Sequence, residues 1–378
     1  MLLLKQTPKP DDEYRRLQHF LANLYVSTPR QMVESLRQEG YVGQDNAVKA
    51  TCLFAFRHIS RLKKLYLHRI DPRLLPKKNN ILFVGPTGCG KTYLVELLFQ
   101  KVIKLPHVIV DMTGYSETGY VGQDVNSVLT RLLYAADMDP SLAAIGIVCL
   151  DEFDKLASSH NRAVFAGAGT TKDVSGLGVQ RELLKLLESS DVPVPVELSH
   201  SDYAPRTVIS TENISFIACG AFSGLKGHIG RLKGEYIGFG RTPLEKGIDA
   251  IAVDYSDEEV EPVRNFQQFG FLPELIGRFD RIIPFHALGE NELTQILKEK
   301  VSKRWAYEFG LHDIQFEIDE EVVRHIIKKS ITRETGARGV EATCIRYIED
   351  AAFEAYSSPG TKKIRLKMKN DEVEYELS

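Results

Sequence analysis

The sequence lacks the features that would assign it at once to a membrane, secreted or nucleic-acid-binding class. No apolar stretch approaches the length of a membrane-spanning helix, so we expect no membrane partner. The apolar start, Met1 to Lys5, is too short for a signal peptide. The formal net charge of −3 gives no indication of a general nucleic-acid-binding protein, and we expect no nucleic-acid partner.

Cysteine is also scarce, and its positions are scattered. The five cysteines are Cys52, Cys89, Cys149, Cys219 and Cys344. None belongs to a C-x-x-C pair, which argues against a zinc finger, and we expect no zinc. An odd number of scattered thiols is typical of a reducing cytosol, so we expect a cytoplasmic protein.

What is present is ordinary globular material. The 378 residues are 43% hydrophobic and 26% charged, enough for two or three domains. Five short apolar runs predict strands buried on both faces of a parallel sheet. These runs are Ile81–Val84, His107–Val110, Ile145–Leu150, Ile214–Cys219 and Arg281–Phe285. Segments of helical period lie between them, so the sequence predicts an α/β fold with a parallel five-stranded sheet.

The pattern changes near Leu288, where an amphipathic helix and then short alternating runs begin. This change predicts a small C-terminal α+β domain. We therefore expect three parts: an N-terminal segment of unknown role at residues 1–26, a large nucleotide-binding domain at 27–287 and a small domain at 288–378. The stretch from Gly220 to Phe269 reads as loop.

A glycine-rich loop follows the first predicted strand and precedes a helix. It consists of Gly85, Pro86, Thr87, Gly88, Cys89, Gly90, Lys91 and Thr92. The spacing G-x-x-x-x-G-K-[ST] is the P-loop signature, in which glycines let several backbone N–H groups point at one phosphate. Lys91 is predicted to contact the β- and γ-phosphates of ATP, and the Thr92 hydroxyl to bind Mg²⁺. Tyr93, the next residue, is counted with the predicted nucleotide contacts.

Two adjacent acids, Asp151 and Glu152, follow the third predicted strand. The carboxyl ends of parallel strands face the ligand crevice. Asp151 is therefore predicted in the Mg²⁺ shell, partly through water, and Glu152 as the group that orients and deprotonates the attacking water. Tyr41 and Val42 lie on a turn upstream of the loop, where an adenine could rest against apolar side chains.

Seven motifs in this order resemble the ClpX family of AAA+ unfoldases. They are Tyr41–Gln44, Gly85–Thr92, Gly119–Val125, Leu150–Lys155, Lys172–Gly176, Gly277–Arg278 and Gly336–Gly339. The resemblance covers roughly residues 27–378. It implies an AAA+ P-loop NTPase core, ATP hydrolysis coupled to protein unfolding, a homo-hexameric ring and a ClpP-type peptidase as partner.

The resemblance also implies roles for single positions. Tyr120 and Val121 would belong to a first pore loop that grips unfolded or tagged protein substrates, and residues 172–178 to a second. Arg278 would be an arginine finger that reaches the γ-phosphate bound by a neighbouring subunit. Arg338 would report nucleotide from the small domain. The residues that would dock on the peptidase are Ile237, Gly238 and Phe239.

The sequence departs from the family pattern in three places. The family's zinc-binding domain with four cysteines has no counterpart here, so zinc-dependent recruitment of adaptors and substrates is expected to be absent. The basic loop at the pore entrance is replaced by the less positive residues 197–206, which puts recognition of a substrate's C-terminal carboxylate in doubt. The strand Ile214–Cys219 ends without an Asn, so no sensor-1 residue is assigned.

Three alternatives stay open. An HslU-like unfoldase has similar pore and nucleotide motifs, but HslU carries a larger inserted domain and a docking C-terminal tail, and neither is evident in this sequence. A stand-alone remodelling chaperone would never meet a peptidase. A nucleotide-switch binding module would need neither Glu152 to activate water nor Arg278 acting from a neighbour.

Overall fold

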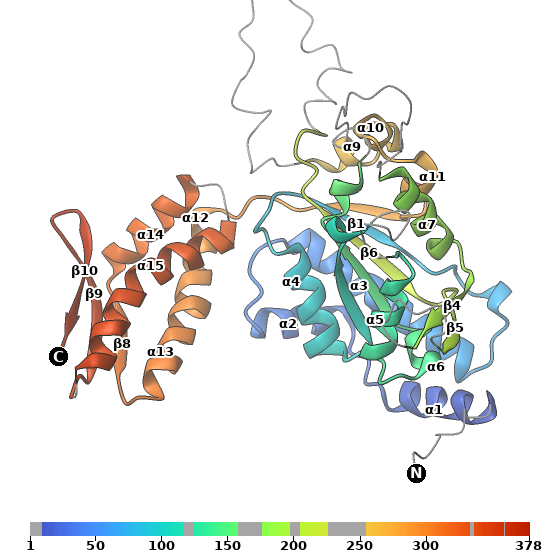
Figure 1. Cartoon of the computed structure of the whole chain (residues 1–378), viewed down its shortest axis with the longest axis horizontal. Helices are drawn as coiled ribbons and strands as arrows, with labels where there is room; N and C mark the ends of the chain where they lie inside the picture. Colours follow the sequence, from blue (N-terminus) through green and yellow to red (C-terminus); the bar gives the residue numbers. More distant parts are fainter. Residues whose placement is uncertain are drawn as a thin grey trace, which may run out of the picture.

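The computed structural model describes residues 10–115, 124–157, 176–196, 205–225, 255–332, 336–358 and 360–378. In Figure 1, the elements up to strand β7 form one body, and those from helix α12 onward lie beside it. Within the described residues, no helix is long and apolar enough to cross a membrane.

A five-stranded parallel sheet forms the centre of the larger body, in the order β2-β3-β6-β1-β7. Its strands are β1 (Ile81–Val84), β2 (His107–Asp111), β3 (Ile147–Asp151), β6 (Ser215–Gly220) and β7 (Arg281–Pro284). The predicted parallel five-stranded sheet is thus confirmed. β1 and β6 are buried at every position, as expected for strands covered on both faces.

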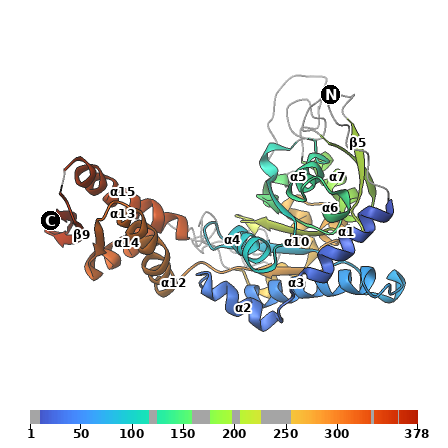
Figure 2. The same cartoon turned by 90° about the horizontal axis from the view of Figure 1, so that it is seen from below.

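Helices cover both faces of this sheet (Figure 2). One face is covered by α1 (Pro10–Asn23), α2 (Pro29–Gln38), α3 (Asp45–Tyr66) and α4 (Lys91–Glu96), which continues as the π-helical turn η2 (Leu97–Ile103). The other face is covered by α5 (Ser127–Ala135), α6 (Pro140–Ala143), α7 (Leu177–Leu187), α10 (Val263–Phe269) and α11 (Pro273–Ile276). Alternate residues of each strand enter the two apolar cores, so Leu82 and Val84 pack on one side and Ile81 and Phe83 on the other.

The stretch from Gly220 to Phe269 was expected to be loop, and its described end is helical. α9 (Asp257–Val260) and α10 occupy it, and Phe266 and Phe269 are fully buried. A second element without a prediction is a two-stranded antiparallel ribbon, β4 (Asp191–Pro195) with β5 (Arg206–Ser210). Its two strands lie at the two ends of residues 197–206, the segment that stands where the family has its basic loop.

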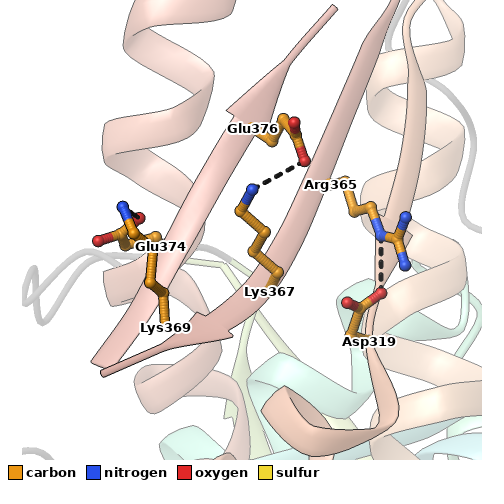
Figure 3. A network of polar contacts seen from close by, with 6 residues as sticks. All are labelled: Asp319, Arg365, Lys367, Lys369, Glu374 and Glu376. Atoms are coloured by element: carbon orange, nitrogen blue, oxygen red, sulfur yellow. Dashed lines mark hydrogen bonds and ion pairs between the residues drawn. The ribbon is translucent and has the colours of Figure 1, made fainter. Parts of the chain in front are cut away.

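The C-terminal body has the predicted α+β content. It contains α12 (Glu290–Ile296), η6 (Leu297–Val301), α13 (Ser302–Gly310), α14 (Glu320–Thr332), α15 (Gly336–Ser357), and strands β8 (Gln315–Ile318), β9 (Lys363–Lys369) and β10 (Glu372–Leu377). The strands form a sheet in the order β10-β9-β8. Figure 3 shows the charged face of this sheet, where Lys367 pairs with Glu376 at 3.0 Å and Arg365 with Asp319 at 2.9 Å.

Candidate nucleotide-binding site

The glycine-rich loop turns sharply between β1 and α4. Gly88 and Gly90 have φ of 77° and 94°, a region that side-chain-bearing residues rarely occupy. Gly85 lies against the neighbouring strand, because a Cβ there would be 2.4 Å from the Phe285 carbonyl oxygen. The loop therefore requires glycine both for its bend and for its close approach to the sheet.

Lys91 and Thr92 open helix α4 and face the end of β3. Lys91 is buried, and its Nζ donates to the carbonyl oxygens of Gly85 at 2.7 Å and Pro86 at 2.8 Å. The Thr92 hydroxyl donates to Asp151 Oδ2 at 2.8 Å. The structure thus brings together the predicted phosphate-binding lysine and both predicted Mg²⁺ ligands.

Glu152 occupies an unusual backbone conformation directly after β3. Its φ is 52°, and its backbone N–H donates to Asp151 Oδ1 at 2.9 Å. Partial burial is the main cause that raises the pKa of Glu152, and the nearby carboxylates of Asp154 and Asp151 raise it further. A left-handed residue at a strand end carries strain that tertiary contacts must hold in place.

Tyr41, on the turn before α3, packs directly on the loop. Its hydroxyl donates to the Gly90 carbonyl at 3.1 Å, and its ring stacks on Tyr93 with centroids 6.0 Å apart. Burial raises the pKa of Tyr41 well above its usual value. Lys300 Nζ lies 3.5 Å from the centroid of the Tyr93 ring, a cation–π contact made from the C-terminal body.

The start of helix α15 also contacts the loop. The Ala337 N–H donates to the Gly88 carbonyl at 3.1 Å. Gly336 has φ of 58°, and a Cβ there would lie 2.7 Å from the same oxygen. Arg338, exposed on the next position, lines the cavity that the loop borders.

These elements enclose a cavity of about 520 Å³, which is within the range of small-molecule sites. Its lining includes Tyr41, Val42, Thr87–Tyr93, Asp151, Glu152 and Arg338. Gly85 and Pro86 are not part of the lining and instead hold Lys91 through their carbonyls. Mg²⁺ commonly takes one or two carboxylates and keeps several waters, and Asp151 with Thr92 suits that preference.

Sequence reasoning missed several residues of this site. Lys300, Arg304 and Glu341 line the cavity from the C-terminal body, although nothing in their local sequence marks them. Gln44 was quoted only as part of a motif, yet its side chain donates to the His286 carbonyl at 2.6 Å and accepts from the His286 N–H at 3.0 Å. Gln44 thereby joins the turn that carries Tyr41 to the segment after β7.

Arg278 is not brought to this cavity. It precedes β7, at the end of the sheet where the strands begin, and forms an ion pair with Glu188. The predicted pore residues Tyr120 and Val121 lie outside the described residues. The same holds for the predicted docking residues Ile237, Gly238 and Phe239.

Comparisons with known proteins agree with this geometry. The family profile of the AAA domain (Cdc48 subfamily) matches residues 76–282, and that of the C-terminal, D2-small domain of ClpB protein matches residues 288–366. The chain is therefore an AAA+ ATPase, and it uses ATP and Mg²⁺.

Two curated relatives narrow the assignment. The ATP-dependent Clp protease ATP-binding subunit ClpX of Treponema denticola is 33% identical over 353 residues, covering 91% of this chain and 81% of the relative. ATP-dependent Clp protease ATP-binding subunit ClpX 3 of Methylococcus capsulatus is 33% identical over 371 residues, covering 94% and 78%. The chain belongs to the ClpX family.

Proposed function

We propose that the chain forms a homo-hexameric ring that threads unfolded or tagged proteins through a central pore into a ClpP-type peptidase. The observation that carries the proposal is the likeness over nine-tenths of the chain to proteins named as ATP-binding subunits of a Clp protease. The position of Arg278 supports assembly, because an arginine finger on the far edge of the sheet can serve only a nucleotide held by another subunit.

Residues of two neighbouring subunits have separate roles in ATP hydrolysis. Backbone N–H groups of the loop and Lys91 bind the phosphates of ATP. Thr92 and Asp151 hold Mg²⁺, which neutralises charge on the phosphates when bound. Glu152 orients a water molecule and accepts its proton, and its raised pKa suits a general base. Arg278 of the next subunit stabilises the charge of the transition state.

The division of the chain into parts belongs to the same proposal. We take residues 27–287 as the large domain, 288–378 as the small domain and 1–26 as an N-terminal segment, whose helix α1 packs on the large domain. Helix α1 supports the last point, since Gln18 Nε2 donates to the Tyr66 carbonyl at 2.8 Å and Leu21 is fully buried. A cytoplasmic location is part of the proposal and rests on the odd number of scattered cysteines.

Mechanical work is assigned to Tyr120 and Val121, since an aromatic side chain grips most sequences through apolar contact. Tyr120→Ala should therefore hydrolyse ATP at the normal rate and fail to unfold a stably folded fluorescent substrate. Loss of fluorescence and phosphate release are followed in the same sample. Normal unfolding by a folded Tyr120→Ala ring would refute the grip.

Peptidase docking is assigned to Ile237, Gly238 and Phe239, where six weak apolar contacts on one ring would act together. Phe239→Ala should keep ATP hydrolysis and unfolding while losing degradation by a ClpP from the same source. Degradation at the wild-type rate would remove this loop as the docking site, whereas no degradation even by the wild-type chain would favour the stand-alone chaperone.

A further inference from the structure

The guanidinium of Arg278 is held by a carboxylate of its own chain. Arg278 pairs with Glu188, at the C-terminal end of α7, and the two side chains are 46% and 41% exposed. Within the described ranges, neither makes another ion pair. The backbone carbonyl of Arg278 accepts a hydrogen bond from Nδ2 of buried Asn80 at 3.0 Å, and this bond fixes the main chain at Arg278. The main chain of Arg278 is thus fixed, while its guanidinium pairs with Glu188.

Helix α7, which ends just before Glu188, is hydrogen-bonded near its other end to the turn that follows β3. Gln180 is fully buried, and its Nε2 donates to the Leu156 carbonyl at 2.8 Å and to the Gly270 carbonyl at 3.1 Å. Its Oε1 accepts from the Leu272 N–H at 2.8 Å. Leu156 ends the short turn that follows Glu152, and Leu272 directly precedes α11. Helix α7 therefore spans from the segment after Glu152 to Arg278.

A carboxylate and a phosphate compete for the same guanidinium. Glu188 takes one Nη group of Arg278, so the guanidinium keeps other N–H donors but presents less positive charge to a γ-phosphate. A carboxylate left beside the phosphate would also oppose its negative charge. Arg278 would therefore act most strongly on a neighbour once the contact with Glu188 opens.

We propose that Glu188 is a positioning residue that holds Arg278 back from the neighbouring subunit's nucleotide and so limits the basal rate of ATP hydrolysis. The inference rests on the proposed function, in which Arg278 acts between subunits. The second pore loop is predicted to end at Gly178, within the first turn of α7. Force on that end of the helix is the means by which a protein substrate releases Arg278.

The test compares four variants, and Arg278→Ala as their reference, with the wild-type chain under saturating ATP. Glu188→Gln keeps the shape and removes the charge, so basal hydrolysis should rise about two- to five-fold, the scale that an exposed ion pair allows. Its further stimulation by an unfolded protein should shrink in proportion. Glu188→Asp should return the rate toward wild type. Asp191→Asn removes a nearby charge, because Asp191 lines the same surface hollow as Glu188 and Arg278, and it should change nothing.

The fourth variant, Arg278→Ala with Glu188→Gln, should hydrolyse no faster than Arg278→Ala alone, because Glu188 acts only through Arg278. An unchanged or lower rate in a folded Glu188→Gln ring, with Arg278→Ala inactive, overturns the inference and leaves the proposed function intact. A wild-type rate in Arg278→Ala overturns the role of Arg278 itself. Thermal unfolding curves and sedimentation establish that each variant is folded and assembled.

Discussion

The carboxyl edge of the five-stranded sheet, where the strands end, differs from the amino edge, where they begin, in how many predicted site residues contact one another. At the carboxyl edge, Lys91, Thr92 and Asp151 already contact one another or the loop, and the cavity they line is closed by a second body of the same chain. At the amino edge, Arg278 stands half-exposed and pairs with Glu188. One edge gathers the predicted nucleotide-binding residues of a single chain, whereas Arg278 at the other edge pairs with a carboxylate of that chain.

The difference supports the proposal that the complete site lies between two copies of the chain. A binding edge built from one chain allows every subunit to hold ATP. In that proposal, a separate edge for Arg278 makes the rate in one subunit depend on its neighbour. We expect variants of the two edges to differ in how strongly they impair ATP hydrolysis.

Removal of Arg278 should produce the largest loss. Arg278→Ala should bind ATP almost normally and hydrolyse it ~10³–10⁵-fold more slowly, as expected for an arginine finger. When it is mixed with Lys91→Ala protein, some interfaces regain both groups, so phosphate release should partly recover. No recovery in hexamers shown to contain both variants would mean that the two edges do not cooperate between chains.

Glu152→Gln removes only the water-activating group from the carboxyl edge. Turnover should fall ~10²–10⁴-fold, the usual contribution of a general base, while ATP binding and assembly persist. Lys91→Ala is the matched comparison and should weaken nucleotide binding itself. Binding is measured with a fluorescent ATP analogue and turnover by phosphate release. Turnover near wild type in Glu152→Gln would remove the assigned role.

The pH dependence of turnover should report the environment of Glu152. A base must be deprotonated, and its pKa is raised, so kcat should be lost as pH falls through a value above that of an ordinary glutamate. The acidic limb should be absent from the residual activity of Glu152→Gln. A limb at the ordinary glutamate pKa would show that Glu152 is solvated during catalysis.

Gly336→Ala tests whether the carboxyl edge depends on the second body. The new methyl group meets the Gly88 carbonyl, and φ of 58° adds backbone strain of about 1–3 kcal/mol. Nucleotide should therefore bind ~5- to 150-fold more weakly by the same energy. Gly310→Ala, with open space around it, is the control. Equal affinities for both variants would show that α15 does not support the loop.

The smallest effect is expected for the charged face of the C-terminal sheet (Figure 3). Lys367→Met and Glu376→Gln each break one ion pair on an open surface, where such pairs add little stability. Neither variant should change ATP hydrolysis or measurably change the thermal unfolding midpoint. A clear fall in hydrolysis would assign this sheet a part in assembly.

Much of the fold could be predicted because its signals are local. Continuous apolar runs gave the five strands, and a motif of eight residues gave the loop between β1 and α4. The ribbon β4–β5 was missed because Pro193 and Pro195 weaken the strand pattern, and they are tolerated in a ribbon with open edges. Helix α10 was missed because its polar residues hide the burial of Phe266 and Phe269.

The chemistry that was missed depends on distant segments. Glu188 and Arg278 are 90 positions apart, and Gln44 and His286 are 242 apart. No local pattern marks such pairs, since they form only when the chain has folded. Roles assigned to Tyr120, Phe239 and Arg338 stay predictions, because they came from family likeness and no contact described above tests them.

Because the first turn of helix α15 contacts the loop at Gly336, a movement of the loop would tilt the whole helix. The helix has 22 residues, which corresponds to about 33 Å, and it touches the loop with its first turn. At its other side it packs against β10. A tilt of only about 5° about the loop would move the far end by about 3 Å, from the same helix length. A small displacement of the loop when a phosphate departs would then become a larger displacement at the end of α15 that lies far from the loop.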